Sequence, residues 1–236
     1  ITSVSNQQIR HLLQLQKKAR ARKEEGVFIV EGIKMYQEAP REWIVKTYVS
    51  ESFLKKAEYQ HVLGQPDAEI LSDEVFRKVS DTQTPQGILC VVRMPENSLE
   101  SMLTQEAPLF LLAENIQDPG NLGTIVRTGE GAGVSGVIMS RDTVDIFNPK
   151  TIRSTMGSIY RVPFLYAEDF QDVIRRIQSR GISVYAAHLK GNASYDDKDY
   201  TGGTAVLIGN EGNGLTEETA ALATDYIRIP MNGEVE

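Results

Sequence analysis

The sequence predicts an α/β protein of two domains, the second built on a mostly parallel sheet. Short apolar runs alternate with segments of helical periodicity along most of the chain. One run, residues 109–113, is apolar at every position, which is typical of a central parallel strand covered on both faces. The length of 236 residues exceeds the usual size of one domain. We therefore expect a domain at 1–95, a linker at 96–107 and a domain at 108–236.

Residues 1–95 are predicted to form a small α/β domain. Its first helix should start after Asn6, a good N-cap residue, and end at Gly26. Strands are expected at residues 27–30, 43–49, 68–71 and 87–92, with helices at 31–39, 51–59 and 73–79. The linker lies between Pro95 and Pro108 and is expected to contain a short helix.

The second domain is predicted to be a doubly wound sheet. Its strands are expected at residues 109–113, 136–139, 162–165, 183–187, 205–208 and 226–229. Helices are expected near residues 121–131, 149–156, 169–180 and 216–223. Strands that alternate with helices in this way favour parallel pairing.

Residues 209–214, Gly-Asn-Glu-Gly-Asn-Gly, form the most informative bend. They follow an apolar strand, and Thr216 is placed to cap the helix after them. Three glycines in six residues permit backbone conformations that other residues avoid, and they let a ligand approach the main chain. A strand, a glycine-rich bend and a helix start form a frequent plan for a ligand site, although a plain surface turn fits the stretch as well. Glu211, in the middle of the bend, favours the ligand site.

A second bend comes directly after the first strand of this domain. Residues 118–121, Asp-Pro-Gly-Asn, have strong turn chemistry. The helix after them places Gly123 and Arg127 on one face, where the glycine permits close approach and the arginine can reach a phosphate. An ordinary loop with a surface arginine is the alternative.

The charge is unevenly distributed, although the net value is −7. Residues 1–95 carry 14 lysines and arginines against 12 acidic residues, whereas residues 96–236 carry 11 against 20. No acidic residue precedes Glu24. This basic stretch is either a site for RNA phosphates or a solvated helix face. Its cations are Arg10, Lys17, Lys18, Arg20, Arg22 and Lys23.

Composition excludes several classes of protein. No apolar run approaches the length that spans a bilayer, so we expect no membrane partner. The single cysteine, Cys90, cannot form an internal disulfide, and three scattered histidines argue against a structural zinc site. We expect no metal and a reducing, cytoplasmic location. The glycine spacings at residues 131–136 and 209–214 lack the context or the lysine that nucleotide-binding motifs need.

Residues 115–128, 207–215 and 229–233 resemble the three motifs of the SpoU (TrmH) branch of the SPOUT RNA methyltransferases, in order and separation. Residues 148–158 and 1–32 are similar to that family's connecting segment and RNA substrate-binding domain. The resemblance covers nearly the whole chain. It implies a catalytic domain with a C-terminal trefoil knot, a homodimer, and S-adenosylmethionine as cofactor. The implied reaction is 2′-O-methylation of a ribose in structured RNA, with ribosomal RNA favoured over transfer RNA.

The resemblance also implies site residues. Arg127 would be the main catalytic residue, with Asn121 and Glu211 beside it. The cofactor would lie against residues after three strands: Ala187, His188, Leu207, Gly209, Asn210, Gly214, Ile229 and Met231. The family's third motif continues past Gly233 with a Ser-Leu-Asn segment and a final helix, which have no counterpart before Glu236. We therefore expect residues beyond Glu236 to complete the cofactor pocket.

Three alternatives stay open at this stage. The chain is also compatible with a transfer RNA methyltransferase and with an inactive RNA-binding relative, although intact Asn121, Arg127 and Glu211 argue against the latter. An enzyme acting on a small nucleotide is the third, and the basic stretch near the amino terminus argues against it.

Overall fold

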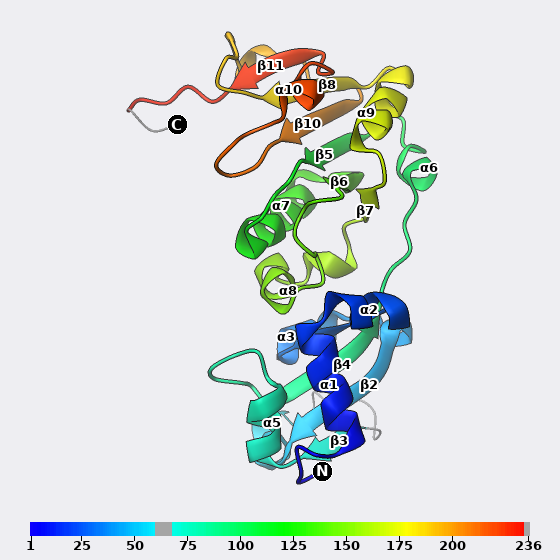
Figure 1. The fold of residues 1–236 in the computed structure, drawn as a ribbon, viewed down its shortest axis with the longest axis vertical. Coiled ribbons are helices and arrows are strands. Elements are labelled where there is room, and N and C mark those ends of the chain that lie inside the picture. The colour runs from blue at the N-terminus through cyan, green and yellow to red at the C-terminus, as the bar shows by residue number, and fades with distance from the viewer. Residues whose placement is uncertain (60–67, 234–236) are drawn as a thin grey trace. The chain divides into compact units, whose positions relative to one another are not determined.

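The computed structural model describes residues 1–59 and 68–233, which form two compact units (Figure 1). Unit 1 comprises Ile1–Glu96 and Asp145–Tyr160, and unit 2 comprises Asn97–Val144 and Arg161–Glu236. The α/β class is confirmed in both. That the chain folds as independent domains with boundaries at residues 95 and 108 stays a prediction. The segment Asp145–Tyr160 belongs to unit 1, although the predicted boundaries place it in the second domain.

Unit 1 is built on a four-stranded sheet of order β1-β4-β2-β3. β4 runs antiparallel to both of its neighbours, and β2 and β3 are parallel. The strands are β1 (Val27–Glu31), β2 (Ile44–Ser50), β3 (Ala68–Leu71) and β4 (Ile88–Arg93). The helices are α1 (Gln7–Lys17), α2 (Ala19–Glu25), α3 (Ile33–Glu38), η1 (Arg41–Trp43), α4 (Glu51–Lys55), η2 (Ala57–Tyr59), α5 (Asp73–Val79), α8 (Pro149–Thr155) and η3 (Ser158–Tyr160).

The two faces of this sheet are covered by different parts of the chain. Alternate residues such as Ile29 pack with α1 and α5, which bury Ile9, Leu12 and Phe76 against them. Phe28, which points to the other face, packs on Phe147 with the rings tilted by 39° and their centroids 4.9 Å apart. The Asp145–Tyr160 segment therefore completes the covering of a strand in unit 1.

The first predicted helix is broken at Lys18, whose backbone is extended (φ −118°). Nη1 of Arg22 donates to the carbonyl oxygens of Leu15 and Gln16 at 2.6 and 3.1 Å. These carbonyls lie at the end of α1, where helical partners are missing, so the guanidinium replaces them. Nη2 of the same side chain pairs with Asp145 at 2.5 Å, and Arg22 is only 3% exposed.

Unit 2 contains a seven-stranded sheet of order β7-β6-β5-β10-β8-β11-β9, and each of its strand pairs is parallel. The predicted, mostly parallel sheet is confirmed. The strands are β5 (Leu109–Ala113), β6 (Gly136–Ser140), β7 (Phe164–Ala167), β8 (Ser183–Ala187), β9 (Ala193–Ser194), β10 (Thr204–Ile208) and β11 (Asp225–Arg228). The helices are α6 (Leu99–Met102), α7 (Pro119–Ala132), α9 (Phe170–Ser179), η4 (Tyr195–Asp197) and α10 (Glu217–Ala220).

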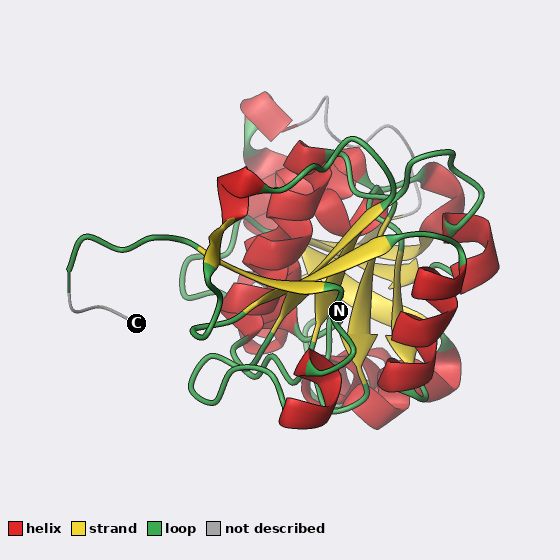
Figure 2. Ribbon diagram, turned by 90° about the horizontal axis from the view of Figure 1, so that it is seen from above, coloured by secondary structure: helices red, strands yellow, loops and turns green. Residues whose placement is uncertain are grey.

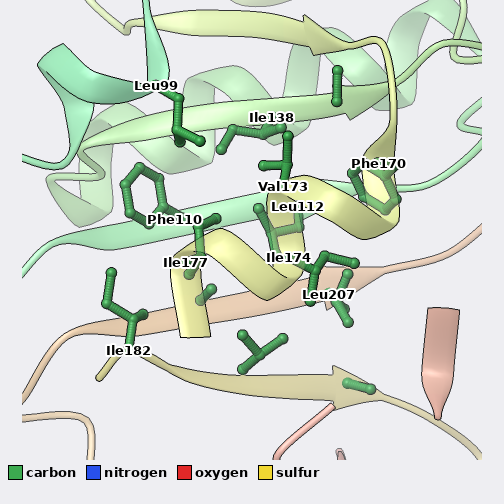
Figure 3. Packing of buried hydrophobic residues seen from close by; sticks show 14 of the residues in the cluster. Leu99, Phe110, Leu112, Ile138, Phe170, Val173, Ile174, Ile177, Ile182 and Leu207 are labelled. Carbon is green, nitrogen blue, oxygen red and sulfur yellow. The ribbon is translucent and has the colours of Figure 1, made fainter. Parts of the chain in front are cut away.

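One face of this sheet carries the main core of unit 2 (Figure 3). α9 presents Phe170, Val173, Ile174 and Ile177 toward the strands, at the 3–4 residue spacing of an amphipathic helix. They pack with residues of β5, β6, β8 and β10, including Leu112. This core fixes the strands, so the loops at their carboxyl ends have defined positions.

The chain after β11 leaves the sheet and runs outward, as Figures 1 and 2 show. Ile229 and Met231 lie on this stretch and are 68% and 57% exposed. Within the described residues, no helix is long and apolar enough to cross a bilayer, and no group of three or more His, Cys, Asp or Glu is arranged to hold a metal ion.

Candidate active site

The two bends singled out in the sequence meet at the carboxyl edge of the unit 2 sheet. They follow β5 and β10, which are neighbouring parallel strands with Ala113 opposite Ile208. Parallel strands end at the same edge of a sheet, so the loops after them are adjacent. Glu211 of the second bend reaches the first, where its carboxylate accepts hydrogen bonds from the backbone N–H groups of Gln117 and Asp118 at 3.1 and 2.9 Å.

Asn121 also donates to Glu211, with 3.3 Å between Nδ2 and Oε1. Burial raises the pKa of the Glu211 carboxyl, but the hydrogen bonds from Asp118, Gln117 and Asn121, together with its own N–H, outweigh burial and hold the pKa below its usual value. A carboxylate with a lowered pKa is a poor proton acceptor at neutral pH. Glu211 is therefore suited to hold the two bends together rather than to act as a base.

Asn210 fixes the shape of the glycine-rich bend. Its Nδ2 donates to the carbonyl of Asn115 at 2.8 Å, and its Oδ1 accepts from the N–H groups of Gly212 and Asn213. The backbones of Asn210 and Gly214 also exchange two hydrogen bonds, of 3.0 and 2.9 Å. These bonds from one residue close the bend and attach it to the loop after β5.

Gly209 is required by a close contact between backbone segments. A Cβ at this position would lie 2.2 Å from the carbonyl carbon of Gly214 and 2.3 Å from the nitrogen of Leu215. These distances are shorter than real Cβ contacts, so the bend can form only with glycine there. The missing side chain at Gly209 therefore lets the two ends of the bend pack directly on each other.

Arg127 lies six residues after Asn121 on α7, whose first turn is capped by Asp118 through the N–H of Asn121 at 2.8 Å. The arginine is exposed, and no hydrogen bond or ion pair engages its guanidinium in the part of the chain that the structure describes. The structure thus brings Asn121 and Glu211 together but leaves Arg127 free to meet a ligand.

The loop after β8 lies next to β11. The His188 ring stacks on Tyr226 with centroids 4.7 Å apart, and the N–H of His188 donates to the carbonyl of Ile227 at 3.0 Å. Nδ1 of His188 accepts from the N–H of Lys190, which orients the ring. Ala187 is exposed at the end of its strand, whereas the Leu207 side chain is fully buried, so only the backbone of Leu207 can serve a ligand.

Gln117 is a residue that the sequence reasoning missed. Its Nε2 donates to Oδ1 of Asn115 at 2.6 Å and to the carbonyl of Asp142 at 2.7 Å, so it links the loops after β5 and β6. Asn115 has a positive φ of 54°, a conformation that asparagine tolerates better than most residues. The polar residues of this turn could have indicated side-chain hydrogen bonds within it. The sequence does not show that Gln117 also binds Asp142, which lies in the loop after β6.

Comparison with known proteins decides the family. The family model of the SpoU rRNA methylases matches residues 108–236, more than half of the chain. The chain belongs to the SpoU rRNA methylase family. A model of the MRM3-like substrate binding domain matches residues 6–90. Two of the three stretches that resemble SpoU motifs, residues 115–128 and 207–215, are the ones that the structure brings together at Glu211.

Curated relatives in the SpoU family extend along the whole chain. A Bacillus subtilis (strain 168) 23S rRNA (guanosine(2553)-2′-O)-methyltransferase is 30% identical, with 100% of this chain and 92% of the relative covered. A Streptomyces viridochromogenes 23S rRNA (uridine(2479)-2′-O)-methyltransferase is 28% identical, with 88% and 76% covered. The crystal structure of an AdoMet-bound rRNA methyltransferase from Sinorhizobium meliloti is 30% identical with a TM-score of 0.85, covering 100% of this chain and 90% of the other.

Most of the cations that we predicted to bind RNA in this SpoU protein are exposed to solvent. Arg10, Lys17, Lys18, Arg20 and Lys23 are exposed on α1, α2 and the residue between them. Arg20 pairs with Glu24, but that pair is solvent-exposed and weak. Arg22 is the exception, and its prediction as an RNA contact is wrong. Its guanidinium is buried on Asp145 and two carbonyl oxygens, so phosphates cannot reach it.

Proposed function

We propose that this chain transfers the methyl group of S-adenosylmethionine to a ribose 2′-hydroxyl of ribosomal RNA. The observation that carries the proposal is the junction of two SpoU motifs at Glu211, beside a helix whose Arg127 has no hydrogen-bond or ion-pair partner among residues 1–59 and 68–233. Similarity to two methyltransferases of 23S rRNA, over 100% and 88% of this chain, favours ribosomal over transfer RNA.

The residues at the carboxyl ends of β8, β10 and β11 are assigned to the cofactor. The bend at residues 209–214 is closed by two backbone hydrogen bonds between Asn210 and Gly214, so its main-chain groups have fixed positions from which they can hold a ligand. In this proposal the cofactor contacts are Ala187, His188, Leu207, Gly209, Asn210, Gly214, Ile229 and Met231. The sulfonium methyl of the cofactor is an activated electrophile, so the protein must mainly position the hydroxyl and manage its proton.

Arg127 is proposed to bind the phosphate beside the target ribose and to stabilise the oxygen as it loses its proton. A guanidinium stays protonated in proteins, so charge stabilisation fits its chemistry better than proton removal. Glu211 holds Asn121 and the first turn of α7 in place. Asn121 lies one hydrogen bond from Glu211 and is assigned to positioning the hydroxyl or the arginine.

The family resemblance supports further proposals about assembly. We assign the chain a C-terminal trefoil knot and a homodimer formed through the catalytic domain. Residues 1–95 are assigned to binding the RNA substrate, 96–107 to a linker and 108–236 to catalysis. The place of action is the cytoplasm, where ribosomal RNA is available to such an enzyme.

The proposal is tested with the cofactor and an unmodified RNA. Calorimetry with S-adenosylmethionine should give saturable binding to the full-length protein. Radiolabelled methyl groups should then pass to ribosomal RNA from a strain that lacks the gene, and mapping of 2′-O-methyl positions should find one that depends on the gene. Binding without transfer to this RNA would overturn the assignment to ribosomal RNA, and failure to bind the cofactor would overturn the reaction itself.

The exposed basic residues should contribute to RNA binding by releasing counterions. Neutralising four of them is expected to weaken affinity for ribosomal RNA and to reduce the slope of log K against log salt by up to about 3, because each phosphate contact contributes about 0.7. Filter binding at several salt concentrations measures both. The four residues are Arg10, Lys17, Lys18 and Lys23.

A second variant, with the same change of net charge, shows whether RNA binding depends on the surface of α1 and α2 or only on the net charge of the protein. It replaces four exposed cations elsewhere in unit 1, namely Lys55, Lys56, Arg77 and Lys78. Cofactor affinity should be the same in both variants. Equal losses of RNA affinity would show that net charge, and not the surface of α1 and α2, controls binding.

A further inference from the structure

A cavity of about 410 Å³ opens at the carboxyl ends of β5, β6 and β7 in unit 2, and we call it the strand-end pocket. None of the residues assigned to cofactor or catalysis lines it. Its lining comes from the loops after these strands and from the first turns of α9 and α10. The lining includes Asn115, Arg141, Asp142, Ala167, Glu168 and Phe170.

The strand-end pocket shares a wall with the Glu211 junction. Asn115 lines the pocket, and its carbonyl accepts from Asn210 at 2.8 Å. Gln117 binds Asn115 and Asp142 through its side chain while its N–H donates to Glu211. A ligand in the pocket is therefore separated from the catalytic bends only by the loop after β5.

The polarity of the pocket excludes a phosphate and favours a group that donates hydrogen bonds. Glu114, Asp142, Glu168 and Asp169 line it against a single cation, Arg141, and the Glu114 carboxylate is already bound by Thr216 and Thr219. Asp169 is occupied in part as the N-cap of α9 through the N–H of Asp172 at 2.9 Å. Among residues 1–59 and 68–233, no hydrogen bond or ion pair engages the carboxylates of Glu168 and Asp142, so their oxygens are available as acceptors.

The volume of the strand-end pocket and its apolar lining residues favour a flat heterocycle as the ligand. Ligand sites in proteins range from about 300 to 1,000 Å³, so a cavity of about 410 Å³ suits one base better than a larger ligand. Phe170 and Ala167, which are buried, supply apolar surface next to the carboxylates. Enzymes that read one nucleotide commonly hold its base in such a pocket, with apolar contact to the ring and hydrogen bonds to its Watson–Crick edge.

We propose that the strand-end pocket receives the base of the nucleotide whose ribose is methylated, and that Glu168 selects guanine. The inference rests on the proposed function. Guanine presents two adjacent donors, N1–H and the 2-amino group, which match the two oxygens of a carboxylate. Uracil presents a single N–H between two carbonyl oxygens, and these oxygens are repelled by a carboxylate.

The test uses nucleoside monophosphates as probes of the full chain by NMR titration. GMP should bind and shift the resonances of Glu168 and Phe170. IMP, which lacks the 2-amino group, should bind about tenfold more weakly, since a bidentate pair contributes at least about a factor of ten. UMP should bind more weakly still. The Glu168→Gln protein should lose about tenfold in GMP affinity, because the amide replaces one acceptor with a donor.

Glu106→Gln is the matched control. Glu106 is exposed and precedes β5, at the opposite edge of the sheet, so the same change of charge there should leave GMP affinity unchanged. Equal GMP affinity in both variants, or UMP binding as tight as GMP, would overturn the inference. Cofactor binding and methyl transfer are measured in parallel. If they persist without selective GMP binding, only the pocket assignment is wrong; if they fail, the proposed function is wrong.

Discussion

Replacing Arg127 with alanine is expected to lower single-turnover methyl transfer by about a thousandfold, the scale on which single charge-stabilising donors act in enzymes. The side chain is exposed and unpaired within the described part of the chain, so its loss should leave the fold intact. Cofactor affinity should also stay close to that of the unaltered protein, because the proposed cofactor surface is the backbone of the Gly209 bend.

The lysine variant separates charge from proton transfer. Arg127→Lys should keep part of the activity because a cation remains, but it lacks the planar paired donors of arginine. If Arg127 instead removes the proton, the rate should rise with pH until the guanidinium has lost its own proton, and Arg127→Lys should displace that profile. Arg175→Ala, which removes an exposed arginine from α9, should be fully active.

Single-turnover rates of these proteins across pH distinguish the cases. A flat profile above neutral pH with residual lysine activity supports charge stabilisation. An Arg127→Ala protein as active as Arg175→Ala would exclude both roles and move the chemistry to other residues of the site.

The position of the site could be predicted from the sequence because its cues are local. The apolar run Leu109–Ala113 identified a central strand, and the glycines at 209–214 and the turn at Asp118 marked the loops after two strands. Parallel pairing then puts both bends at one edge of a sheet. Asn6 and Thr216 cap their helices as predicted, since capping depends only on neighbouring residues.

Contacts between distant residues could not be predicted in this way. Arg22 looks like one cation among six, and its burial depends on Asp145, 123 residues away. The break of the first helix at Lys18 has the same cause, because Arg22 binds the carbonyl groups that the break leaves free. On the same helix, Ile9, Leu12 and Leu15 are fully buried, whereas Leu13 is only partly buried.

The role of Glu211 could not be predicted from the sequence either. A carboxylate in a glycine-rich bend suggests a proton acceptor as readily as a structural group. Only its partners decide, because the N–H groups of Gln117 and Asp118 lower its pKa and occupy its oxygens. Since the folded-state pKa is lowered, this contribution to stability is complete at neutral pH and is lost as the pH falls through that lowered value.

Replacing Gly209 with alanine is expected to destroy the site without touching a catalytic side chain. The new methyl group would lie 2.2 Å from the carbonyl carbon of Gly214 and 2.3 Å from the nitrogen of Leu215. Both are backbone atoms, which cannot rotate away as a side chain does. We expect a loss of about 3 kcal/mol in the free energy of unfolding of unit 2, the upper range for overpacking. Cofactor binding should become undetectable because the bend no longer closes.

Gly212→Ala is the control within the same bend. A Cβ there would meet only Oδ1 of Asn210, at 3.8 Å, an ordinary van der Waals distance, and the N–H of Gly212 can still donate to that oxygen. This variant should unfold and bind S-adenosylmethionine like the unaltered protein. Urea denaturation followed by circular dichroism and calorimetry with the cofactor measure both effects. Equal stability and affinity in the two alanine variants would show that the bend adapts, and that its backbone is not the surface that holds the cofactor.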